Sequence, residues 1–130
     1  MLTFYKGHAN AMSKLILKMV SSDETFLDRA AKQEKEKIPF FIKSKYKVVS
    51  NDYKKFEFHT INQKSKNNKH ILYFHGGALC LNGSISHWMM IDKWVKKTDA
   101  KATYIHYPMI PKYKTNEIFR KSFYIYKHIL

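Results

Sequence analysis

Hydrophobic residues recur along the amino-terminal part of the chain with the spacing of helices. Between residues 12 and 20, apolar residues at positions 12, 15, 16 and 19 have the spacing of an amphipathic helix. Ser21 and Glu24 then fit a capping box for a second helix. We expect this second helix to run to about Lys37 and to stop before Pro39, because a residue that precedes proline disfavours helical geometry.

Two segments in the middle of the chain have the composition of strands. Residues 46–50 form the first, and residues 54–61 form the second, in which phenylalanine alternates with polar residues. Asn51 and Asp52 lie between them and are typical turn residues. The pattern predicts an antiparallel hairpin that turns at Asn51-Asp52.

The last sixty residues alternate between strand and helix patterns. The apolar run from Ile71 to Phe74 predicts a short strand that is buried on both faces. A helix is expected from Ser84 or Ser86 to Thr98, a strand over residues 102–106, and a final helix over residues 115–130. Strand, crossover helix and strand form a right-handed unit with parallel strands, so the fold class is α/β, a mixed sheet flanked by helices.

The strand that ends at Phe74 continues directly into His75-Gly76-Gly77-Ala78. Paired glycines allow a sharp turn and leave backbone N–H groups open to a ligand, because no Cβ blocks the approach. A loop of this kind at the carboxyl end of a strand is suited to holding an oxyanion.

This loop resembles the His-Gly-Gly-Gly oxyanion loop of α/β-hydrolase esterases and lipases, in particular the hormone-sensitive-lipase-like group. A second segment, from Tyr107 to Tyr113, is similar to that group's tyrosine-x-leucine-x-proline segment, with Met109 in the leucine place. Ala78 stands where the pattern has its third glycine and still supplies a backbone N–H. The two matches have the family's order and spacing, and together they cover Ile71 to about Leu130.

The resemblance implies an incomplete α/β-hydrolase-like sheet and a role for each loop residue. The N–H groups of Gly77 and Ala78 would form the oxyanion hole, Gly76 would permit the turn, and His75 would brace the loop. Residues 41–130 would be the amino-terminal half of the hydrolase domain. Residues 1–40 would contribute helices to a cap over the substrate pocket, although packing helices without a substrate role fit the sequence equally well.

The sequence contains no catalytic triad. The family needs a Gly-x-Ser-x-Gly serine, followed by an acid and a histidine. The four glycines are Gly7, Gly76, Gly77 and Gly83, and no two are four residues apart. We therefore expect an amino-terminal fragment of a carboxylic-ester hydrolase, inactive alone and acting on a small acyl ester when completed. The alternative is a non-catalytic basic module that uses the same half-fold to bind an acidic partner.

Charge and cysteine content remove several other classes. The net charge is +14, but only Arg29 and Arg120 among the 24 basic residues are arginine, which disfavours nucleic-acid recognition as the main function. Cys80 is the only cysteine, so it forms no intramolecular disulfide, and we expect a buried, inert thiol. No histidine spacing predicts a metal site, and no cofactor is expected. No apolar run is long enough to span a membrane, and we expect a cytoplasmic protein.

The predicted strand from Ile71 to Phe74 raises a question of pairing. In the resembled fold it lies between the 102–106 strand and the strand that carries the nucleophile, and this sequence has no counterpart of the second neighbour. Its outer edge should then expose unpaired backbone groups, with no Lys or Pro inside the strand to discourage pairing. We expect self-association through this edge, aggregation, or a requirement for a separate carboxyl-terminal polypeptide.

Overall fold

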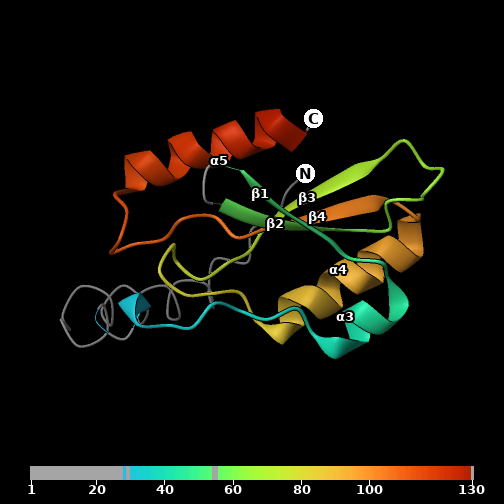
Figure 1. Cartoon of the computed structure of the whole chain (residues 1–130), viewed down its shortest axis with the longest axis horizontal. Helices are drawn as coiled ribbons and strands as arrows, with labels where there is room; N and C mark the ends of the chain where they lie inside the picture. Colours follow the sequence, from blue (N-terminus) through green and yellow to red (C-terminus); the bar gives the residue numbers. More distant parts are fainter. Residues whose placement is uncertain (1–27, 29, 54–55, 130) are drawn as a thin grey trace, which may run out of the picture.

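The computed structural model describes residues 28, 30–53 and 56–129. Within them a four-stranded sheet is covered by helices on both faces, with α5 on one side and α3 and α4 on the other (Figure 1). The elements in chain order are α3 Phe40–Lys45, β1 Val49–Tyr53, β2 Phe56–Ile61, β3 His70–Phe74, α4 Ile85–Thr98, β4 Lys101–Ile105 and α5 Thr115–Ile129. The α/β class predicted from the sequence is confirmed, as are α4 and α5.

The sheet has the order β1-β2-β4-β3. β2 pairs antiparallel with β1 and with β4, whereas β3 pairs parallel with β4, placing Ile71 beside Ala102 and Phe74 beside Ile105. The predicted strand–helix–strand unit with two parallel strands is confirmed. β3 is at the end of this order, so β4 is its only neighbour among the described strands. The predicted burial of this strand on both faces is therefore wrong, because its residues are half-buried and Phe74 is exposed.

The predicted turn at Asn51-Asp52 is wrong. Both residues lie inside β1, where Asn51 pairs with Phe58 and Asp52 pairs with Glu57. Continuing β1 to Tyr53 completes the ladder along β2, and this pairing outweighs the low strand propensity of Asn and Asp. Their side chains are exposed, so they keep their hydration while the backbone pairs.

The amino-terminal helices could be tested only in part. The predicted helix over residues 12–20 lies outside the described residues. The second predicted helix is wrong at its carboxyl end, because helical structure stops at Ala31 and residues 33–39 are irregular. The short helix α3 follows Pro39 and was missed; it has six residues, of which only Ile42 is buried. The irregular segment instead contacts the loop after β3 through Gln33.

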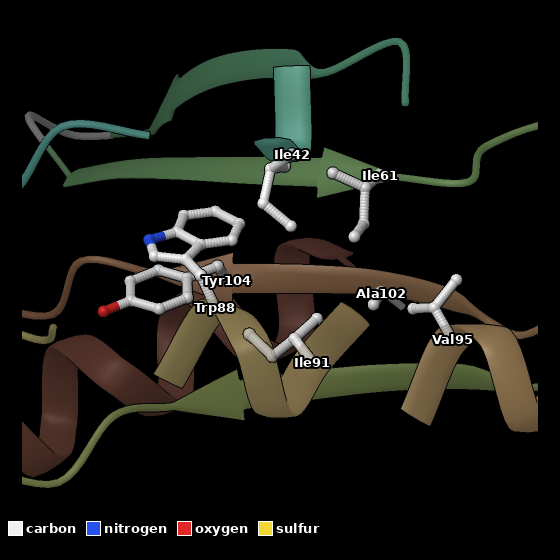
Figure 2. Packing of buried hydrophobic residues seen from close by; sticks show 7 residues of the cluster. All are labelled: Ile42, Ile61, Trp88, Ile91, Val95, Ala102 and Tyr104. Carbon is white, nitrogen blue, oxygen red and sulfur yellow. The ribbon is translucent and has the colours of Figure 1, made fainter. Parts of the chain in front are cut away.

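One hydrophobic cluster lies between the sheet and the helices α3 and α4 (Figure 2). Trp88 of α4 stacks on Tyr104 of β4, with ring centroids 4.3 Å apart and planes 7° from parallel. The buried members of the cluster are Ile42, Ile61, Trp88, Ile91, Val95, Ala102 and Tyr104. The α4 members are three to four residues apart, which explains why the sequence pattern located this helix.

A second cluster lies on the opposite face, beneath α5. Ile118 and Ile125 of α5 pack with Ile105 of β4 and with two phenylalanines of β2, Phe56 and Phe58. Ala102 and Tyr104 point to the first cluster and Ile105 to the second, so the alternation of β4 supplies both layers. Because β3 and β4 run parallel, their carboxyl ends lie side by side at one end of the sheet, and helices cover both faces of that sheet.

Candidate functional site

The loop after β3 has an unusual backbone. Gly77, Ala78 and Leu79 have φ values of 131°, 51° and 62°, so three successive residues have positive φ. The carbonyl of Gly77 accepts hydrogen bonds from the N–H groups of Cys80, at 3.0 Å, and Leu81, at 2.9 Å. Positive φ at both central residues is the feature of a type I′ turn, here formed by residues 77–80.

The need for glycine falls at Gly77 rather than at Gly76. A Cβ on Gly77 would lie 2.4 Å from the carbonyl oxygen of Leu81, whereas one on Gly76 would meet only the Nε2 atom of His87, at 3.8 Å. Gly76 also has no positive φ. The turn that the sequence assigned to Gly76 is thus made by its neighbour.

The N–H groups of Gly77 and Ala78 donate to no acceptor in the part of the chain that the structure describes. They lie in the loop that follows the carboxyl end of β3, separated from the strand by His75 and Gly76, where the sequence predicted an oxyanion loop. Two N–H groups on successive residues of a tight turn that have no acceptor among the described residues can donate hydrogen bonds to a negatively charged oxygen.

His75 supports the loop from within. Its side chain is 3% exposed and its ring stacks on Tyr107, with centroids 4.4 Å apart. Nδ1 lies 2.8 Å from the carbonyl oxygen of Gly76, which can only accept, so Nδ1 carries the proton. Burial lowers the pKa of His75, which keeps the ring neutral. This arrangement fits the bracing role that the sequence suggested.

The second sequence motif contacts the first. The Tyr107 hydroxyl donates to the carbonyl oxygen of His75 at 2.6 Å, and the Ile110 N–H donates to that of Leu79 at 2.9 Å. Burial raises the pKa of Tyr107 to about 12, so its hydroxyl remains a donor at neutral pH. Segments about thirty residues apart in the sequence thus form one structural unit.

The irregular segment at residues 33–39 also reaches the loop, which the sequence reasoning missed. The side-chain amide of Gln33 donates from Nε2 to the Cys80 carbonyl and accepts at Oε1 from the Asn82 N–H, both at 3.0 Å. The Asn82 side chain in turn donates to the Glu34 carbonyl at 2.7 Å. A helix had been expected here, and no local pattern signals bonds to partners almost fifty residues away.

Just beyond this contact, Glu36 accepts a 2.5 Å hydrogen bond from the hydroxyl of Tyr104. Burial and the Glu36 carboxylate together hold the pKa of Tyr104 far above its usual range. Gly83 lies against this pair, and a Cβ there would be 1.6 Å from the Tyr104 hydroxyl oxygen. Gly83 therefore makes room for the segment to bind.

Several histidines are buried without forming a metal site. Burial lowers the pKa of His59 to about 4 and that of His106 to about 3, with nearby lysines contributing. The ring centroids of His59 and His106 are 5.0 Å apart. Among the described residues no group of His, Cys, Asp or Glu side chains could hold a metal ion.

Cys80 is fully buried behind the loop, and burial raises the pKa of its thiol. Its Sγ lies 3.5 Å from the carbonyl oxygen of Gly77. A buried thiol with a raised pKa is a weak nucleophile, in agreement with the inert role expected from the sequence.

A hollow of about 400 Å³ opens between the end of β3 and α5. It is almost entirely apolar, and its aromatic rim is exposed: Phe119 is 66% exposed, Phe123 54% and Phe74 39%. The lining residues are Phe74, His75, Leu79, Tyr107, Ile118, Phe119, Ser122, Phe123 and Tyr126. The hollow therefore adjoins the base of the loop and Phe74 at the end of β3, a strand that has only one neighbour among the described strands. None of the described helices is long and apolar enough to cross a membrane.

Solved structures share this architecture. A candidate esterase from Staphylococcus aureus matches 81% of the chain with a TM-score of 0.71 and 24% identity. The fold is that of part of an α/β-hydrolase. Esterase E25 matches 90% of the chain with a TM-score of 0.51 and 20% identity. The chain spans 36% and 35% of the lengths of these two proteins.

No model of a known protein family matches the sequence, and no curated protein sequence is similar to it. The resemblance is therefore carried by the fold. The incomplete α/β-hydrolase-like sheet expected from the sequence corresponds to what these neighbours contain.

Proposed function

We propose that this chain is the oxyanion-binding part of a carboxylic-ester hydrolase of the hormone-sensitive-lipase-like group. In this proposal residues 41–130 form the amino-terminal half of the hydrolase domain, and residues 1–40 contribute to a cap over the substrate. Support comes from the braced turn after β3, from its contact with the second motif, and from structural neighbours described as esterases.

The observation that carries the proposal is the pair of N–H groups on Gly77 and Ala78, which have no acceptor among the described residues. When a serine attacks an ester carbonyl, the carbonyl oxygen becomes negatively charged in the tetrahedral intermediate. Two N–H groups fixed on a rigid turn stabilise that charge without reorganising during the reaction. Loss of one such donor costs about 10²–10³ in rate, so the loop would supply a large share of the catalysis.

The nucleophile, the acid and the base must come from elsewhere, because this sequence has no Gly-x-Ser-x-Gly. The polypeptide that supplies them would add a strand to the open edge of β3 and cover the apolar hollow beside it. A serine at the end of such a strand would lie next to the loop. The chain alone is then inactive and would act on a small acyl ester only when completed.

The decisive experiment starts from the DNA downstream of this coding region, translated in all frames. A polypeptide with Gly-x-Ser-x-Gly, an acid and a histidine is expressed alone and together with this chain. We expect hydrolysis of p-nitrophenyl butyrate, and fluorophosphonate labelling of the new serine, only when both polypeptides are present. The chain alone should give neither signal.

Two results would contradict the proposal. Labelling of Ser84 or Ser86 in the isolated chain would mean that the nucleophile has been misassigned, since these hydroxyls are close to the loop in the sequence. Absence of any downstream Gly-x-Ser-x-Gly would argue against a hydrolase and would favour a non-catalytic binding module.

A further inference from the structure

The loop conformation requires support from outside the loop. Ala78 and Leu79 both have positive φ, which residues other than glycine adopt only when the surrounding structure holds them there. One support is the hydrogen bond from the Ile110 N–H to the Leu79 carbonyl. This bond acts on the middle of the turn and leaves its carboxyl-terminal side, residues 80–82, to be held by something else.

Gln33 contacts that other side through both the nitrogen and the oxygen of its side-chain amide. The two hydrogens on Nε2 serve the carbonyls of Cys80 and Ala30, each at 3.0 Å, and Oε1 accepts from the Asn82 N–H. The bond to Ala30 anchors the side chain to its own segment. The other two bonds fix one carbonyl and one N–H of the loop, two residues apart.

We infer that Gln33 is a positioning residue for the oxyanion loop. The inference rests on the proposed function in one respect, the assignment of this loop to an oxyanion. A side-chain amide is suited to the task because it presents a donor and an acceptor together. Glutamate would keep the acceptor but lose the donor to Cys80, and methionine would lose both at similar size. The loop is thus held from an irregular segment more than forty residues upstream.

The test compares amide hydrogen exchange, residue by residue, in the full chain and in Gln33→Met, Gln33→Glu and Gln63→Met. Gln63 is the other glutamine of the chain and is exposed, so its variant is a matched control. In Gln33→Met we expect the amides of Cys80, Leu81 and Asn82 to exchange about tenfold faster, as loss of one or two hydrogen bonds predicts. In Gln33→Glu, Asn82 should stay protected, whereas Cys80 and Leu81 exchange faster.

The exchange of Cys80 and Leu81 decides the question, because their N–H groups bond to Gly77 and not to Gln33. If only Asn82 changes, Gln33 merely caps one N–H and the inference is overturned. If amides throughout β4 and α4 change by the same factor, the substitution destabilises the whole domain, and the inference also fails. The Gln63→Met variant should match the unmodified chain.

A second measurement uses the completed enzyme. There, Gln33→Met should lower kcat about tenfold with little change in KM, because the oxyanion contact is made only in the transition state. Failure to obtain any active assembly would count against the proposed function, while the exchange result in the isolated chain would still decide the role of Gln33. An unchanged kcat together with faster loop exchange would show that the held conformation is not the catalytic one, and would overturn the inference.

Discussion

Two adjacent glycines of the loop should respond in opposite ways to the same substitution. In Gly77→Ala the new Cβ would lie 2.4 Å from the Leu81 carbonyl oxygen, on a residue whose φ is 131°. That oxygen belongs to the backbone and cannot swing aside as a side chain would. In Gly76→Ala the only close atom in the described part of the chain is His87 Nε2 at 3.8 Å, an ordinary contact, and φ is not positive.

The expected magnitudes follow from these distances. At Gly77, backbone strain of about 1–3 kcal/mol adds to an overpacking cost of about 1–3 kcal/mol, so the free energy of unfolding falls by about 2–6 kcal/mol. At Gly76, alanine restricts the unfolded chain and should leave stability unchanged or raise it by about 0.4–1 kcal/mol. For a domain of this size, that loss lowers the Tm of Gly77→Ala by roughly 7–22 °C.

Thermal and urea unfolding followed by circular dichroism measure both effects, with Gly76→Ala as the matched control. Equal Tm values for the two variants would refute the reasoning, because they would mean that the turn at residues 77–80 is not fixed in the conformation described. A Gly76→Ala variant less stable than Gly77→Ala would place the constrained glycine one residue earlier.

Three further predictions concern other parts of the molecule. Burial lowers the pKa of His59 to about 4 and that of His106 to about 3, so below pH 6.5 the unfolded chain binds more protons than the folded chain. Tm should therefore stay constant above pH 6.5 and fall steadily toward pH 4. The fall should be smaller in His106→Gln. Gly83→Ala should lower stability by about 1–3 kcal/mol, and by less in a Tyr104→Phe background, where the clashing hydroxyl is gone. Light scattering should detect self-association that increases with salt, because salt screens the +14 charge. Phe123→Glu should reduce this association, whereas Phe40→Glu on the opposite face should not. A chain that stays monodisperse at every salt concentration would contradict the prediction.

The carboxyl-terminal half of the fold could be predicted because its signals are local. β3 is a continuous apolar run, and α4 buries residues at helical spacing, so both elements can be read directly from the sequence. Asn51 and Asp52 misled the prediction because their turn propensity is also local, whereas the register with β2 is set by the whole ladder. In β1, pairing with β2 overrode the local turn preference of these two residues.

The candidate site was predictable to a similar extent. The residues of the loop could be identified from a short motif, but its positive φ values at Ala78 and Leu79 could not, because neither residue favours them and distant contacts impose them. Gln33 gave no signal at all. Its hydrogen-bond partners in the loop are almost fifty residues away, and the sequence around it has the pattern of a helix.

The two edges of the sheet differ in a way that limits how the protein can assemble. At one side, β1 presents the exposed polar side chains of Ser50, Asn51 and Asp52, whereas at the other β3 presents an apolar strand. A sheet that can grow from both sides adds copies without limit and forms fibres, but one that can grow from a single side stops after the first addition. Edge-to-edge pairing of this chain, if it occurs as we predict, would therefore be self-terminating and would give discrete pairs rather than filaments.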